Sequence, residues 1–103
     1  MSRHVCKPEE NIEVHMGYDR PLSRLYLTIY DASNPDSIIY DDLDDESCDP
    51  FTDFKKPVTS QLSHFQMRIK EVGGSNWNIP EEFYIGVIDD AMHQRCNAET
   101  KTY

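Results

Sequence analysis

Residues 24–30 read Arg24-Leu25-Tyr26-Leu27-Thr28-Ile29-Tyr30, and in them aliphatic side chains alternate with hydroxyl-bearing ones. A β-strand places alternating side chains on opposite faces of a sheet. The segment is rich in strand-forming residues and lies between Pro21 and Pro35, which mark turns. We therefore predict a strand whose aliphatic side chains face a core and whose tyrosines face away from it.

Two neighbouring segments extend this strand into an antiparallel meander. Residues 12–16 also alternate between apolar and polar side chains, and a turn containing Pro21 joins them to the strand. Residues 37–41 follow a second turn and form the third predicted strand, with Ile39 pointing inward and Ile38 and Tyr40 pointing outward.

The second half of the chain has the periodicity of helices. Apolar residues recur at spacings of four and three from Val58 to Val72, and a pair of glycines ends this pattern. A second helix is predicted from about Pro80 to Gln94, with five apolar residues buried: Phe83, Tyr84, Val87, Ile88 and Met92. Gly86 inside it costs about 1 kcal/mol relative to Ala, which indicates a close approach to another backbone.

These elements predict an α+β fold, a three-stranded antiparallel β-meander with two helices packed on one face. A chain of 103 residues forms a single domain, residues 1–103. We expect residues 1–10 and 97–103 to be mobile tails and residues 42–57 to form an acidic loop.

The segment Gly17-Tyr18-Asp19-x-Pro21-Leu22, followed by an alternating aliphatic strand, resembles the opening of a family of small uncharacterised bacterial proteins. The resemblance covers residues 16–31, with a looser echo in Ile79-Pro80-Glu81-Glu82. It implies a bacterial origin, and because no activity is known for the family it assigns no functional residue.

The negative charge of the chain is concentrated in one segment. Nineteen acidic and ten basic residues give a net charge of −9, and residues 25–54 hold nine of the acids and no lysine or arginine. The remaining residues are balanced. Such a segment repels phosphate backbones and attracts basic partners.

We predict that the tyrosine face and the acidic loop bind a basic protein partner. The residues assigned to this surface are Tyr26, Tyr30, Tyr40, Asp41, Asp42, Asp44, Asp45 and Glu46. Tyrosines are enriched in protein interfaces, and an acidic rim steers basic partners. In the alternative interpretation the rings only cover the open side of a two-layer protein. Direct nucleic-acid binding is not expected, and a homodimer through the open sheet is compatible with either interpretation.

No motif in the chain indicates a cofactor, a metal site or a catalytic group. The acidic loop lacks the EF-hand pattern. His4, Cys6, His93, Cys96 and Cys48 could supply zinc ligands, but their spacings match no familiar zinc module. Four acidic neighbours make Cys48 a poor nucleophile. The alternative function is a small enzyme whose carboxylate-based or metal-assisted site is assembled from distant residues.

The location predicted from the sequence is the cytoplasm. No apolar run approaches the roughly 20 residues that span a bilayer, and the N-terminal residues lack the apolar core of a signal peptide. Three widely spaced cysteines fit reduced thiols better than a disulfide framework.

Overall fold

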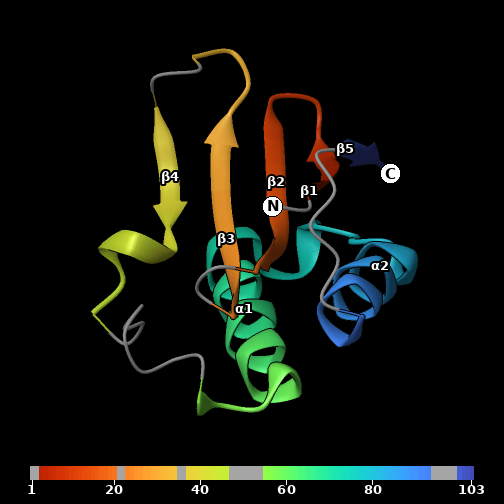
Figure 1. Cartoon of the computed structure of the whole chain (residues 1–103). Coiled ribbons are helices and arrows are strands. Elements are labelled where there is room, and N and C mark those ends of the chain that lie inside the picture. The colour runs from red at the N-terminus through yellow and green to blue at the C-terminus, as the bar shows by residue number, and fades with distance from the viewer. Residues whose placement is uncertain (1–2, 21–22, 35–36, 47–54, 94–99) are drawn as a thin grey trace.

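A five-stranded mixed sheet carries two helices in this α+β protein (Figure 1). The computed structural model describes residues 3–20, 23–34, 37–46, 55–93 and 100–103. Its strands are β1 (Arg3–Glu9), β2 (Ile12–Asp19), β3 (Arg24–Asp31), β4 (Ile38–Asp41) and β5 (Thr100–Thr102). The helices are α1 (Val58–Gly73) and α2 (Glu81–Met92), with short 3-10 turns η1 (Asp42–Asp44) and η3 (Gly74–Asn76).

The strand order in the sheet is β4-β3-β2-β1-β5. The predicted meander is present as β2, β3 and β4, which pair antiparallel in sequence order. It is flanked by β1, which pairs antiparallel with β2, and by β5, which pairs parallel with β1. The three-stranded sheet of the prediction is therefore the larger part of a wider sheet.

The described parts of the two segments predicted to be mobile tails, residues 1–10 and 97–103, contribute strands to this sheet, which corrects that expectation for them. Arg3–Glu9 forms β1, and its residues His4, Val5 and Cys6 are buried. Thr100–Thr102 forms β5, which lies beside β1 in Figure 1. Of the predicted acidic loop, residues 47–54 lie outside the described part of the chain.

Both helices cover the same face of the sheet, where the alternation of β3 places its aliphatic side chains. Leu25, Leu27 and Ile29 are fully buried, as predicted. Helix α1 packs on β3, and α2 packs on β2 and β1. At about 25 cal/mol per Å² of apolar surface, this burial is the main favourable contribution to folding.

Helix boundaries follow the periodic pattern closely. Helix α1 buries Phe65 and Ile69 and ends at Gly73, where Gly74 has a positive φ of 62° that suits glycine. Helix α2 buries Phe83 and Val87. Met92 is 75% exposed, contrary to prediction. In the last turn of α2 the buried residues are Asp90 and Ala91.

Candidate functional site

The eight residues predicted to bind a partner divide between two hollows next to β4. The first hollow is lined by Tyr40, Asp41, Asp44, Asp45 and Glu46, and the second by Tyr26, Tyr30, Asp41 and Asp42. Asp41 belongs to both. The predicted residues therefore lie close together around β4, but they form two separate surfaces and not one.

Tyr40 points to the opposite side of the sheet from the predicted one. Tyr30 pairs with Ile38, and Ile29 pairs with Tyr40, so β4 carries one extra residue, Ile39, between these two pairs. A β-bulge of this kind reverses the alternation of the bulged strand. Tyr40 consequently lies with Ile29 on the helix-covered face and packs against the core. The predicted face of three tyrosines therefore consists of Tyr26 and Tyr30 only.

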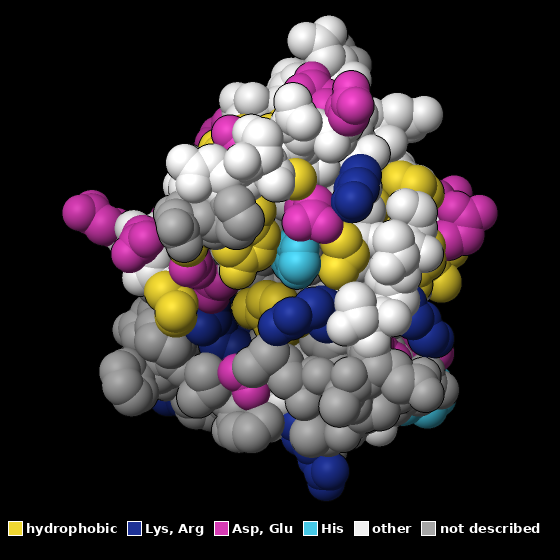
Figure 2. Space-filling view, turned by 90° about the horizontal axis from the view of Figure 1, so that it is seen from above, with side chains coloured by type: hydrophobic (Ala, Val, Ile, Leu, Met, Phe, Trp, Pro, Cys, Tyr) yellow, Lys and Arg dark blue, Asp and Glu magenta, His cyan; other side chains and the backbone are white. Residues whose placement is uncertain are grey.

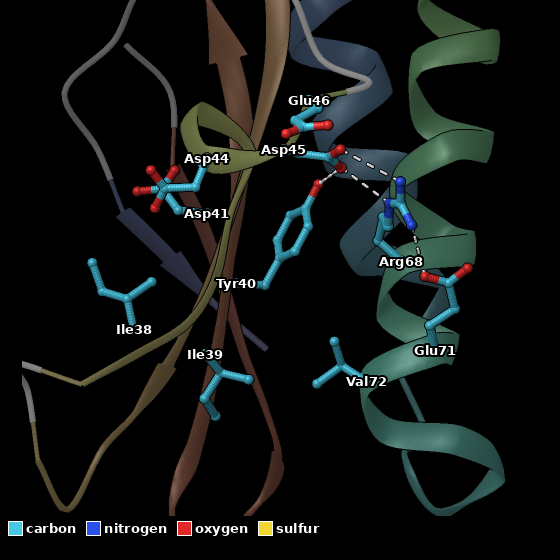
Figure 3. A pocket seen from close by; sticks show the side chains of 10 residues that line it. All are labelled: Ile38, Ile39, Tyr40, Asp41, Asp44, Asp45, Glu46, Arg68, Glu71 and Val72. Carbon is cyan, nitrogen blue, oxygen red and sulfur yellow. Dashed lines mark hydrogen bonds and ion pairs between the residues drawn. The ribbon is translucent and has the colours of Figure 1, made fainter.

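The first hollow, here called the β4–α1 groove, has a volume of about 610 Å³ and lies between the edge strand and helix α1. Its apolar lining comes from four residues: Ile38, Ile39, Tyr40 and Val72. Five carboxylates and one guanidinium complete the lining, from Asp41, Asp44, Asp45, Glu46, Glu71 and Arg68. Figure 3 shows Tyr40 and Arg68 pointing toward Asp45 at one end of the groove, with Ile39 and Val72 at the other.

Asp45 organises the polar end of this groove. Its carboxylate accepts hydrogen bonds from the Tyr40 hydroxyl at 2.6 Å and from Arg68 Nε at 3.0 Å, and His64 Nε2 lies 3.3 Å away. Arg68 also donates to Glu71 at 2.9 Å. Hydrogen bonds with Glu71 and Asp45 raise the pKa of Arg68 above its usual value. Among the described residues that line the groove, the one guanidinium is thus already paired with two carboxylates, and the lining keeps an excess of negative charge.

Asp42 has a structural role and does not belong to an exposed acidic loop. Its carboxylate accepts hydrogen bonds from Arg24 Nη2 and, at 3.2 Å, from the backbone N–H of Leu27. Because β4 ends at Asp41, the part of β3 that contains Leu25 and Leu27 has no strand beside it on that side. Side chains replace the missing strand there: Asp42 accepts from the backbone N–H of Leu27, and Gln61 Oε1 accepts from the N–H of Leu25 at 2.8 Å. Burial raises the pKa of Asp42, and the charge of Arg24 partly offsets this.

The second hollow, here called the open-face pocket, lies on the side of the sheet that the helices leave uncovered and has a volume of about 310 Å³. Tyr26, Thr28 and Tyr30 of β3 line it together with His15 of β2 and Arg3 of β1. Burial raises the pKa of Tyr26, and a hydrogen bond with Arg3 partly offsets this. Burial likewise lowers the pKa of His15, although Glu13 acts in the opposite direction. The tyrosines are half-buried walls of a pocket and not a flat exposed platform.

The surface of the molecule is not uniformly acidic. In the view of Figure 2, a histidine side chain lies between hydrophobic side chains, with acidic and basic side chains next to it. Charges of both signs are thus interspersed on this face, whereas the β4–α1 groove has mainly one sign.

Several residues of the two hollows were not predicted. Arg68, Glu71 and Val72 come from a helix far away in sequence, and Arg3 comes from the segment expected to be a tail. The sequence contains no local signal for these residues. It does contain one for the bulge in β4, because the consecutive apolar residues Ile38, Ile39 and Tyr40 break the alternation expected of a half-buried strand.

The candidate zinc ligands do not come together in the described residues. His4 and Cys6 lie in the core, where His4 Nε2 is 2.6 Å from Asp90 Oδ2 and Nδ1 is 2.8 Å from the Tyr103 hydroxyl. His93 is exposed, and Cys48 and Cys96 lie outside the described ranges. Within those ranges, no group of three or more His, Cys, Asp or Glu side chains is placed to hold a metal ion.

The chain was also compared with known proteins. No protein-family model matches it, and neither a curated protein nor a solved structure is significantly similar to it. The resemblance of residues 16–31 to a bacterial family therefore stays a prediction. Neither described helix has the length and apolar character needed to cross a bilayer.

Proposed function

We propose that this protein is a small cytoplasmic binding module that holds a basic, extended segment of a partner protein in the β4–α1 groove. The observation that carries the proposal is the lining of the groove, an apolar floor beside a sheet edge with five carboxylates against one paired guanidinium. It keeps the basic partner expected from the sequence and moves the contact from the tyrosine face to the groove.

The backbone of β4 supports binding of an extended segment. β4 is an edge strand, and such strands leave half of their backbone N–H and C=O groups without a partner in the sheet. A peptide can add to such an edge through main-chain hydrogen bonds, while its side chains contact alternate pockets. Ile38 is 48% exposed and Ile39 is 44% exposed, so apolar side chains of the partner would find apolar contacts there.

The charges of the groove select the sign of the partner. Asp44 and Glu46 are exposed, and neither makes an ion pair within the part of the chain that the structure describes. Exposed carboxylates of this kind increase the association rate of basic partners more than they increase the final affinity. They also repel phosphates, so direct nucleic-acid binding is not part of the proposal.

No specific observation favours the alternative of an enzyme. The two most buried carboxylates of the region, Asp42 and Asp45, are each held by an arginine. A homodimer through the open sheet stays a prediction. Sedimentation at several protein concentrations tests it, because a dimer would double the molecular mass as the concentration rises.

The proposal is tested with a short peptide that alternates lysine and valine. We expect saturable binding by fluorescence anisotropy, with NMR shifts concentrated in Ile38–Asp41 and in α1 from Arg68 to Val72. The double variant Asp44→Asn/Glu46→Gln is expected to bind about twofold to thirtyfold more weakly, because each of two exposed ion pairs contributes about 0.2–1 kcal/mol. Ile39→Ser is expected to weaken binding about tenfold through the loss of apolar contact.

Two matched controls make the result specific to the groove. Glu9→Gln/Glu10→Gln removes the same charge from another exposed place, and Ile85→Ser removes an isoleucine of similar exposure, 58%, from α2. Both should bind the peptide nearly as the parent protein does. Equal binding of a glutamate–valine peptide, or equal weakening by the control variants, would show that the groove is not the binding site.

A further inference from the structure

Two buried nitrogen atoms at the open-face pocket have no hydrogen-bond partner in the described part of the protein. They are Arg24 Nε and His15 Nε2, and both residues line the pocket. A buried polar atom without a partner costs about 1–3 kcal/mol, so such atoms are rare in folded proteins and require an explanation. His15 also lines a neighbouring hollow together with Glu13, so Arg24 is the main indication that the open-face pocket receives a ligand.

Arg24 is the stronger of the two indications. Its side chain is only 3% exposed, and its Nη2 is engaged by Asp42, which fixes the plane of the guanidinium. Since an arginine in a protein is always protonated, Nε–H can act only as a donor. The missing partner is therefore an acceptor, and a carboxylate oxygen makes the strongest bond of this type.

His15 adds a second polar contact at the same pocket. Its ring packs against the Tyr30 ring in a T-shaped arrangement, with centroids 4.9 Å apart, and its side chain is 17% exposed. The nearest carboxylate oxygen, Glu13 Oε2, lies 3.8 Å from Nε2, which is beyond hydrogen-bond distance. Glu13 thus lies near this nitrogen without making a close hydrogen bond to it in the described residues.

The shape of the pocket suits a small molecule. Tyr26 and Tyr30 lie on the same face of β3 with the smaller Thr28 between them, so that Thr28 forms a low point between two rings. The volume of about 310 Å³ lies at the lower end of the range for small-molecule sites, which is about 300–1,000 Å³.

The charges of the pocket oppose a simple anion. Arg24 and Asp42 pair with each other, which leaves Asp19 and Asp41 against the single positive charge of Arg3 in the lining. The whole chain also carries a net charge of −9. A ligand with only a carboxylate would meet these negative charges, whereas a ligand that also carries an ammonium group would be attracted by them.

We propose that the open-face pocket binds a small zwitterion of the free amino-acid class, with its carboxylate at the guanidinium groups of Arg3 and Arg24, its ammonium group facing Asp41 and its side chain between Tyr26 and Tyr30. This site is separate from the peptide groove, although both are lined by Asp41, and it does not depend on the proposed function. It uses donors and acceptors that the fold leaves in one place: Arg24, His15 and Asp41.

NMR titration with L-leucine and with L-phenylalanine tests the proposal. The Nε–H of Arg24 gives its own ¹H–¹⁵N signal, and we expect it to shift in a saturable way together with the amides of residues 26–30. Two leucine analogues that each lack one charged group serve as comparison probes: isocaproate, which lacks the ammonium group, and isoamylamine, which lacks the carboxylate. Each is expected to bind about tenfold or more weakly than leucine, since each loses one of the two charged contacts.

A variant that blocks the pocket without touching Arg24 or Asp42 completes the test. Thr28→Phe fills the space between the two tyrosines and should weaken leucine binding about tenfold or more, while Thr59→Phe on the exposed start of α1 should leave it unchanged. The proposal is overturned if neither amino acid shifts the Arg24 signal, in which case the pocket holds only water. It is also overturned if isocaproate or isoamylamine binds as well as leucine, or if Thr28→Phe has no effect.

Discussion

At the scale of single residues, neighbouring carboxylates of the acidic segment have different roles. Asp42 is 2% exposed and is held by Arg24, whereas Asp44, two residues later, is exposed at the rim of the groove. A buried carboxylate is tolerated only where a cation and further donors surround it. Composition cannot separate these two roles, because the distinction depends on where β4 ends.

Asp42→Asn is expected to reduce the free energy of unfolding by about 3–5 kcal/mol, because it leaves the buried guanidinium of Arg24 without its opposite charge. Urea denaturation measures this loss. Asp44→Asn is the matched control and should change stability by less than about 0.5 kcal/mol. Equal effects of the two variants would mean that Asp42 is not the partner of Arg24 in solution.

At the scale of elements, the regular parts of the chain were predictable and the irregular parts were not. Local alternation predicted the faces of β3, and helical spacing predicted α1 as far as Gly73. β4 was predicted with the wrong face for Tyr40, because one inserted residue, Ile39, reverses its alternation. The run of apolar residues from Ile38 to Tyr40 indicates an irregularity, but the pairing with β3 is needed to locate the inserted residue.

The strands β1 and β5 were missed for a different reason. His4 is a polar residue in a segment without a clear apolar pattern, so the local sequence does not predict its burial, yet it is 1% exposed. It can be buried because Asp90 and Tyr103, both far away in the sequence, supply partners for its two ring nitrogens. A contact of such long range leaves no periodic signal in the chain. The same holds for Arg3 and Arg68, which complete the two hollows.

Gly86 marks the place where α2 meets these two strands. The sequence predicted a close approach to another backbone, but the approaching groups are side chains: a Cβ on residue 86 would lie 2.4 Å from the Tyr103 hydroxyl and 2.8 Å from His4 Cε1. Gly86 is therefore close to another part of the chain, as predicted, but the neighbouring atoms belong to side chains and not to a backbone.

Gly86→Ala is expected to loosen β5, although alanine alone favours a helix by about 1 kcal/mol. The Tyr103 N–H, which donates to Val5 O at 2.8 Å, should lose protection in hydrogen exchange. In a Tyr103→Ala background the closest of the two contacts is absent, so the same substitution should cost less stability. A Gly86→Ala protein that is more stable than the parent, with Tyr103 still protected, would contradict the contact.

At the scale of the whole molecule, a buried thiol and a partly buried phenol make stability sensitive to high pH. Burial raises the pKa of the Cys6 thiol from 9.0 to about 12, so between these values the unfolded chain releases a proton that the folded protein keeps. Stability therefore falls as the pH rises from 9.0 toward about 12. Burial also raises the pKa of Tyr84 to about 12, which acts in the same direction.

Cys6→Ala should make this dependence shallower, by up to about 1.4 kcal/mol per pH unit, even if the smaller side chain lowers stability at neutral pH. Urea denaturation at a series of alkaline pH values measures the slope for both proteins. Alkylation followed by peptide mapping gives an independent check, since Cys6 should react only in the unfolded chain. An unchanged slope would show that Cys6 is not deprotonated on unfolding in this range.

The way in which the sheet ends has a consequence for colloidal behaviour. β4 has four residues, β5 has three, and beyond β4 the backbone of β3 is sealed by the side chains of Asp42 and Gln61. At the other edge, β5 carries Lys101, a residue type that discourages unwanted pairing. Because short edge strands offer few backbone groups for pairing with another chain, we expect the protein to stay monodisperse in light scattering although Ile38 and Ile39 are exposed.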